Sequence, residues 1–159
     1  MSAVDPAVRT GRLPNGLRYF VRANGKPEKR AELRLVVNAG SVLEDPDQRG
    51  LAHFVEHMEF EGTQHFPREG INAFLASLGL GIGPDANAET SFDDTQYTLR
   101  IPAGSPQVLD RALLVLEDWA HAATFDQDAI DRQRGIVLSE WRLHLGAAER
   151  TGDKIRKVQ

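Results

Sequence analysis

The sequence contains no cysteine among its 159 residues. Disulfide bonds, thiolate metal sites and a cysteine nucleophile are therefore excluded for this chain. The sequence also lacks an apolar run close to the roughly 20 residues that a membrane span needs. Residues 1–11 show no basic start followed by an apolar stretch, so we expect neither a membrane span nor a signal peptide in this chain.

A strong excess of either charge is also absent. The chain has 19 Lys and Arg against 23 Asp and Glu, a formal net charge of −4. This balance offers no electrostatic argument for nucleic acid or an anionic membrane as a partner. The length fits a single domain that can bury a core. Any partner therefore has to be argued from a specific site.

The hydrophobic patterns predict an α+β fold, with a mainly antiparallel sheet packed against helices. Hairpin-like strands, rather than regular alternation of strand and helix, favour the antiparallel arrangement. Strand patterns occur over residues 8–22 as a hairpin, 31–38 and 95–101. Helical patterns occur around residue 53 up to Gly62, over residues 71–79 and 105–122, and from Asp126 onward.

The last two predicted helices each carry an apolar stripe, which we expect to face the core. Ser105-Pro106 and Asp126 are suited to begin them. The stripe of the first consists of Leu109, Ala112, Leu113, Leu116 and Ala120. The stripe of the second consists of Ile130, Val137, Trp141 and Leu145.

The segment 50–58 carries two histidines four residues apart, His53 and His57, with Glu56 directly before the second. In a helix this spacing places the three side chains within about a third of the circumference. The opposite side carries the apolar residues Leu51, Phe54, Val55 and Met58. We therefore expect a helix with a packing face and a separate chemical face.

Two imidazoles at this spacing can converge on one zinc ion at about 2.0–2.1 Å. A catalytic zinc takes about three protein ligands and keeps an open position for water. Glu56 adjoins His57 in the sequence, which suits a base that takes a proton from that water better than a ligand. The alternative is that His53 and His57 are surface or hydrogen-bonded histidines, and these residues alone leave both interpretations open.

The third ligand has to come from elsewhere in the chain. Glu140 is distinctive because its helical neighbours are apolar, so its carboxylate lies at the margin of a packing face and needs a partner. That partner could equally be water or an arginine such as Arg134. The open candidates are Glu59, Glu61, His65, Asp85, Glu89, Asp93, Asp94, Glu117, Glu140 and His144.

Five short blocks occur in order along the chain. They are Pro-Asn-Gly-Leu at 14–17, His-Phe-Val-Glu-His-Met at 53–58, Phe-Glu-Gly-Thr at 60–63, Asn-Ala-Glu-Thr at 87–90 and Arg-Gly-Ile-Val-Leu-Ser-Glu-Trp at 134–141. Together they resemble the N-terminal part of the M16 metallopeptidases, the family of pitrilysin, insulysin and mitochondrial processing peptidase. The resemblance is greatest to the PqqL-like zinc proteases of bacteria. It extends from about residue 13 to residue 142.

The resemblance implies the LuxS/MPP-like metallohydrolase fold and a Zn²⁺ cofactor. It also implies that His53, His57 and Glu140 are zinc ligands and that Glu56 is the general base that activates the zinc-bound water. Gln133 stands seven residues before Glu140, where the family often carries a second glutamate. An amide keeps the capacity to hydrogen-bond behind the ligands but removes a charge there.

The resemblance further implies a zinc endopeptidase module that hydrolyses extended peptides. Asn87 and Ala88 match the family's edge strand, to which a substrate peptide adds as a further strand. Family members usually consist of homologous halves, so we expect a second M16-type domain, in the same chain or in a partner subunit, to be needed for full activity. The alternative function is a non-catalytic peptide-binding or partner subunit.

Residues 1–159 are expected to form a single N-terminal peptidase domain that is truncated at its C-terminal end. Alone, such a chain would have weak or no peptidase activity. Family resemblance favours a periplasmic location, although the compartment is not encoded in these residues.

Overall fold

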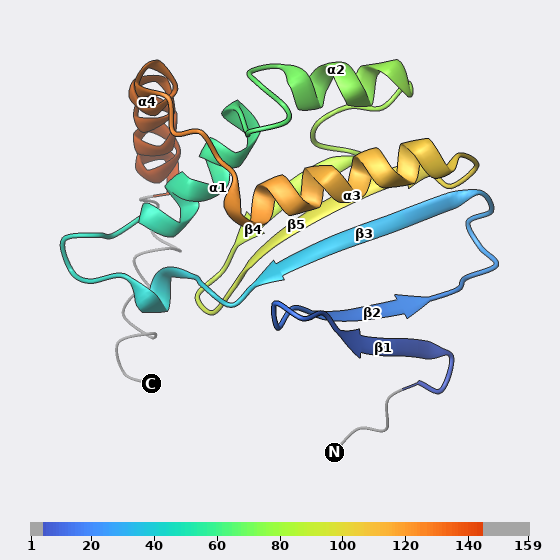
Figure 1. Ribbon diagram of the computed structural model, residues 1–159. Coiled ribbons are helices and arrows are strands. Elements are labelled where there is room, and N and C mark those ends of the chain that lie inside the picture. The colour runs from blue at the N-terminus through green and yellow to red at the C-terminus, as the bar shows by residue number, and fades with distance from the viewer. Residues whose placement is uncertain (1–4, 145–159) are drawn as a thin grey trace.

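A computed structural model describes residues 5–144 and shows strands and helices in mixed order (Figure 1). In chain order the elements are β1 (Val8–Arg12), β2 (Arg18–Arg22), β3 (Arg30–Val37), the 3-10 helix η1 (Ser41–Leu43), α1 (Leu51–Glu61), α2 (Gly70–Ser77), β4 (Ala86–Thr90), β5 (Thr95–Pro102), α3 (Pro106–His121) and α4 (Gln127–His144). The predicted α+β architecture is confirmed. Within the described part, none of the helices has the length and apolarity needed to cross a bilayer.

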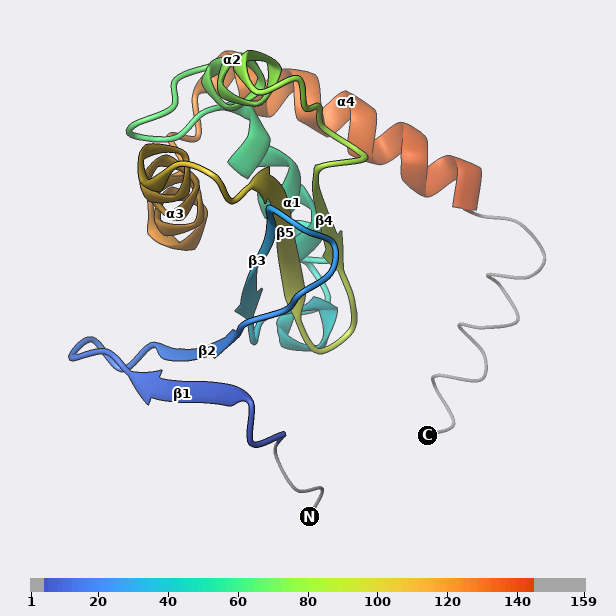
Figure 2. The same ribbon diagram turned by 90° about the vertical axis from the view of Figure 1, so that its right-hand side faces the viewer.

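The strands form two antiparallel sheets. β1 pairs with β2, and a second sheet has the order β3-β5-β4, which leaves β4 at an edge. Figure 2 shows the β1–β2 hairpin set apart from the larger sheet. Every residue of β2 is therefore exposed, including Phe20 at 65%, and the alternating pattern of this strand has no buried face in the described part.

The core lies on the helix-covered face of the three-stranded sheet. Tyr97, Leu99 and Ile101 of β5 are buried there. α3 lies across β3 and β5, whereas α1 contacts β4 and α4. Trp119 of α3 stacks on Tyr97 with 5.4 Å between ring centroids. Because α1 contacts the edge strand β4, the helix lies at that edge of the sheet.

The orientation of α3 differs from the predicted stripe. Ala112, Val115 and Trp119 are buried, whereas Leu109 and Leu113 are 39% and 50% exposed. An indole buries more area than an aliphatic side chain, so the helix turns Trp119 inward. The predicted stripe is confirmed for Ala112 and Leu116, which lie in or against the core. It was wrong for Leu109, Leu113 and Ala120, which are exposed, and it left out Trp119.

The start of α4 is as expected from the sequence. Asp126 Oδ1 accepts hydrogen bonds from the backbone N–H groups of Asp128 and Ala129 at 3.0 and 3.2 Å. Such a cap satisfies donors that have no partner within the helix. Trp141 of the predicted stripe is 59% exposed, and Leu145 lies outside the described residues.

The first turn of α1 is capped by a residue from the preceding loop. The carboxylate of Glu44 accepts hydrogen bonds from the backbone N–H groups of Gly50 and Ala52, each at 2.8 Å. Gly50 has φ +88°, a conformation that favours glycine. The helix that carries His53 therefore begins at a position set by Glu44.

Glu44→Ala is expected to lower the free energy of unfolding by about 1 kcal/mol, the typical value of a helix cap. Chemical denaturation of the chain measures this loss. Glu28→Ala, at an exposed loop position, is the control and should change stability much less. Equal losses in both variants would contradict the capping role.

Asp118 ties the loop after α1 to α3. Its side chain is fully buried and accepts hydrogen bonds from Thr63 Oγ1 at 2.5 Å, His65 N at 2.9 Å and His65 Nδ1 at 2.7 Å. Burial raises the pKa of Asp118, but these hydrogen bonds outweigh burial and hold the pKa below its usual range. The charged form is therefore the stable one in the folded protein.

Asp118→Asn is expected to lower the free energy of unfolding by about 1.5–3 kcal/mol at neutral pH, the range for hydrogen bonds to a charged group. A depressed pKa contributes stability above the ordinary aspartate value of about 3.9, and this contribution is lost as the pH falls through the folded-state value. The gap between the two proteins should therefore shrink in acid. Unfolding curves at several pH values test this, with exposed Asp110→Asn as the control; a gap that is independent of pH would contradict it.

Candidate metal centre

His53, His57 and Glu140 converge where α1 packs against α4. The two histidine Nε2 atoms are 3.1 Å apart, and Glu140 Oε2 lies 3.6 Å from His53 Nε2 and 3.4 Å from His57 Nε2. These three residues form a group that can hold a metal ion. Of the third-ligand candidates whose side chains are described, Glu140 is the one that joins the two histidines.

The three ligand atoms fit a zinc ion. Tetrahedral zinc with bonds of 2.0–2.1 Å keeps its ligand atoms about 3.3–3.4 Å apart. The observed separations of 3.1, 3.4 and 3.6 Å lie around this value. His53 is 40% exposed and Glu140 is 37% exposed, so the group is accessible to a small molecule from one side, as a site with an open position requires.

The predicted division of α1 into a packing face and a chemical face was partly wrong. Glu56 is 9% exposed, whereas Leu51, which was assigned to the packing face, is 48% exposed. The reason is that β4 and α4 both pack against α1, which encloses the side that carries Glu56. Glu56 therefore lies between packed elements, whereas His53 stays accessible.

Glu56 is held in place by β4. Thr90 Oγ1 donates a hydrogen bond of 2.5 Å to Glu56 Oε2. The sequence interpretation gave Thr90 no role, although it lies two residues after Ala88 and alternate residues of a strand share a face. Thr90 thus connects the edge strand to the carboxylate beside the metal-binding group.

Gln133 lies directly behind His57. Its Oε1 is 2.9 Å from His57 Nδ1, and its Nε2 donates to Glu61 Oε1 at 2.5 Å. Arg132 donates to the other oxygen of Glu61 at 2.7 Å. Burial raises the pKa of Glu61, but the bonds from Arg132 and Gln133 outweigh it and hold the pKa below its usual range. The sequence interpretation missed Arg132 and left Glu61 as a possible ligand.

Other third-ligand candidates have different surroundings. His65 is bound to Asp118, and Glu117 lies 3.9 Å from His121. Glu59 is buried, and burial, together with the negative charge of Asp118, raises the pKa of Glu59 to about 8. Its carboxyl is therefore mainly neutral at pH 7. The side chain of His144 lies outside the described residues.

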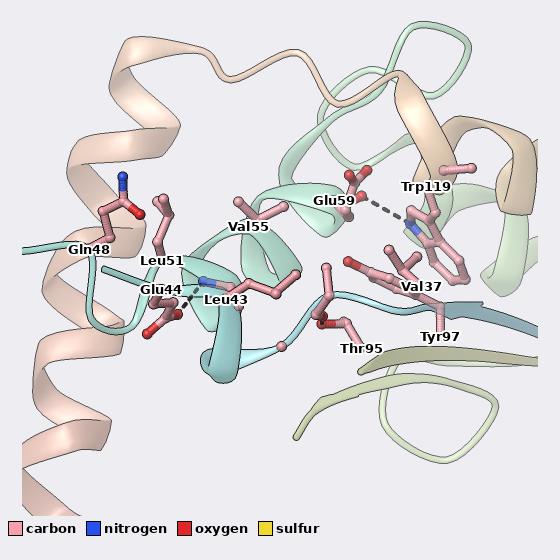
Figure 3. Close-up of a pocket in the computed structure, with 14 residues that line it drawn as sticks. Val37, Leu43, Glu44, Gln48, Leu51, Val55, Glu59, Thr95, Tyr97 and Trp119 are labelled. Atoms are coloured by element: carbon pink, nitrogen blue, oxygen red, sulfur yellow. Dashed lines mark hydrogen bonds between the residues drawn. The ribbon is translucent and has the colours of Figure 1, made fainter. Parts of the chain in front are cut away.

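An apolar cavity of about 310 Å³ lies on another side of α1 (Figure 3). Val55, Tyr97 and Trp119 line it, and Trp119 Nε1 donates to the backbone oxygen of Glu59 at 3.1 Å. None of His53, His57 and Glu140 is among its lining residues. The cavity and the metal-binding group are therefore separate features.

Asn87 and Ala88 lie in β4, the edge strand nearest to α1. Asn87 is paired with Thr98 and Ala88 with Tyr97 of β5. Asn87 is exposed and Ala88 is half-buried. The outer side of β4 is not paired with another strand in the described part.

The sequence matches the family described as Insulinase (Peptidase family M16) over residues 19–148. The chain belongs to the M16 peptidase family. The Haemophilus influenzae protein named Probable zinc protease PqqL is 43% identical over 155 residues, which cover 98% of this chain and 17% of that protein. The Arabidopsis thaliana Zinc protease PQQL-like is 42% identical, over 90% of this chain and 15% of that protein.

M16 membership is matched by the fold. The crystal structure of the first half of the periplasmic protease PqqL from Escherichia coli aligns with a TM-score of 0.87 and 38% identity, over 94% of this chain and 32% of that chain. The chain spans about a sixth of the length of the Haemophilus influenzae and Arabidopsis thaliana relatives. These relatives are named zinc proteases, and the group formed by His53, His57 and Glu140 can hold a metal ion.

Proposed function

We propose that this chain carries the zinc-binding and proton-transfer residues of an HxxEH endopeptidase that cleaves extended peptides. The observation that carries the proposal is the convergence of His53, His57 and Glu140 within 3.6 Å, beside Glu56. Two imidazoles and one carboxylate form a known ligand set of catalytic zinc in peptidases. Membership of the M16 family supports the same reaction.

Zinc at this site would lower the pKa of a water molecule and polarise the scissile carbonyl. Glu56 would take a proton from the attacking water and later give it to the leaving amine. Thr90 donates to Oε2 of Glu56 and so holds the carboxylate in a fixed orientation. The low exposure of Glu56 shields the transferred proton from bulk water.

The edge strand β4 supplies the binding surface for the substrate backbone. A peptide that adds to its outer side would form backbone hydrogen bonds at Ala88, because the backbone groups of Asn87 face β5, and Asn87 would offer its exposed side chain. Affinity would then depend little on the peptide sequence. Thr90 belongs to the same strand and contacts Glu56. The strand proposed to bind the peptide therefore also positions the proposed catalytic base.

Full activity requires a second M16-type domain, from the same chain or from a partner subunit. The name of the Escherichia coli structure, the first half of PqqL, supports this, because that protein has a further half and this chain covers 32% of the first one. Residues 1–159 act as one N-terminal peptidase domain of the longer assembly. A periplasmic location agrees with the name of the Escherichia coli structure.

The test is cleavage of an unstructured fluorogenic peptide by the parent protein before and after treatment with a chelator. Hydrolysis should stop when the metal is removed and return when zinc is added. Cleavage that continues unchanged in the chelator would contradict the proposal. Peptide binding without cleavage, persisting after chelation, would instead support the alternative of a non-catalytic binding subunit.

A further inference from the structure

A line of hydrogen bonds runs from the surface of α4 to the metal-binding group. Arg132 donates to Glu61 Oε2 at 2.7 Å, and Gln133 Nε2 donates to Glu61 Oε1 at 2.5 Å. At the other end of the same amide, Gln133 Oε1 lies 2.9 Å from His57 Nδ1. Gln133 is 9% exposed, so its amide is largely shielded from water.

Each group in this line determines whether the next group donates or accepts a hydrogen bond. A carboxylate only accepts hydrogen bonds, so the end of the Gln133 amide that faces Glu61 must be its NH₂. The opposite end is then the carbonyl oxygen, which also only accepts. His57 Nδ1 must therefore carry the proton, which leaves the lone pair on Nε2, the atom beside His53 and Glu140.

We propose that Glu61 and Arg132 are positioning residues that orient the Gln133 amide and thereby hold His57 in the tautomer that can bind zinc. This inference rests on the proposed zinc site. It assigns a role to two residues that touch neither the metal-binding group nor the substrate strand. The effect passes through Gln133 alone, since Gln133 makes the described contact with His57.

Glu61→Gln would reverse the donor and acceptor roles along the line while nearly keeping the shape of the side chain. Arg132 would attract the carbonyl oxygen of the new amide, so that its NH₂ would face Gln133. The Gln133 amide would then turn and present NH₂ to His57 Nδ1, which favours the tautomer with a proton on Nε2. Gln133→Glu in addition would restore the proton to Nδ1, because the carboxylate introduced there would accept hydrogen bonds from both neighbours.

The experiment measures zinc affinity of the parent protein by competition with a chromophoric chelator. We expect Glu61→Gln to weaken binding about 10–100-fold, the usual cost of losing a partner behind a metal ligand. Adding Gln133→Glu to this variant should recover most of the lost zinc affinity. The same substitution made in the wild type should change zinc affinity by a smaller factor. The exposed Glu117→Gln is the charge-matched control and should bind zinc like the wild type.

A second readout is the tautomer of His57 in the metal-free protein, observed from its ring ¹⁵N chemical shifts. The wild type and the double variant should carry the proton on Nδ1, and Glu61→Gln should carry it on Nε2. Unchanged affinity in Glu61→Gln, or the same factor from Gln133→Glu in both backgrounds, would overturn the inference. Because zinc affinity is measured without substrate, the inference can fail while hydrolysis persists, or hold when no hydrolysis is found.

Discussion

Glu56→Gln is expected to lower the rate of peptide hydrolysis by about 10²- to 10⁴-fold, the usual contribution of a general acid–base residue. Glutamine has nearly the same shape and can still accept the hydrogen bond from Thr90 Oγ1. It cannot take a proton from water at neutral pH. The loss should therefore fall on kcat rather than on peptide binding.

The zinc content of the Glu56→Gln protein should remain that of the wild type, because Glu56 is outside the group formed by His53, His57 and Glu140. Steady-state kinetics and metal analysis of the same preparation measure both quantities. Glu117→Gln, at an exposed position of α3, is the control. Unchanged turnover in Glu56→Gln would remove this residue from the proton-transfer role.

Glu140→Gln should weaken zinc binding by more than the roughly 10–100-fold that loss of an outer partner costs. The substitution replaces the carboxylate of the proposed third ligand, which lies 3.4–3.6 Å from the two histidine nitrogens, with a neutral amide. Hydrolysis should fall in parallel and recover in part when excess zinc is supplied. Chelator competition measures the affinity, with Glu117→Gln as the control. Full zinc occupancy in Glu140→Gln at low free zinc would point to a different third ligand.

The parts of the fold that depend on neighbouring residues could be predicted from the sequence. The spacing of His53 and His57, the end of α1 near Gly62 and the cap at Asp126 all follow from local helical geometry. The edge position of β4 came from the family resemblance. In each case the relevant interactions lie within a few residues or in a block shared with relatives.

The parts that depend on distant contacts could not be predicted. Residues alone left ten candidates for the third ligand, because only the packing of α1 on α4 brings Glu140 to the histidines. The contact between Thr90 and Glu56 likewise joins separate elements. The orientation of α3 depends on where the ring of Tyr97 meets Trp119. The hydrophobic periodicity of one segment does not show which residue of another segment it will contact.

The proposed ligands come from two helices, with His53 and His57 on α1 and Glu140 near the end of α4. A zinc ion bound by these residues would crosslink α1 to α4 in addition to its role in catalysis. Ligand binding to the folded state alone adds about 2.7 kcal/mol of stability when the free ligand is at 100 times Kd. Removal of zinc would therefore lower the stability of the packing between α1 and α4, which would then depend on contacts such as those of Glu61 with Arg132 and Gln133.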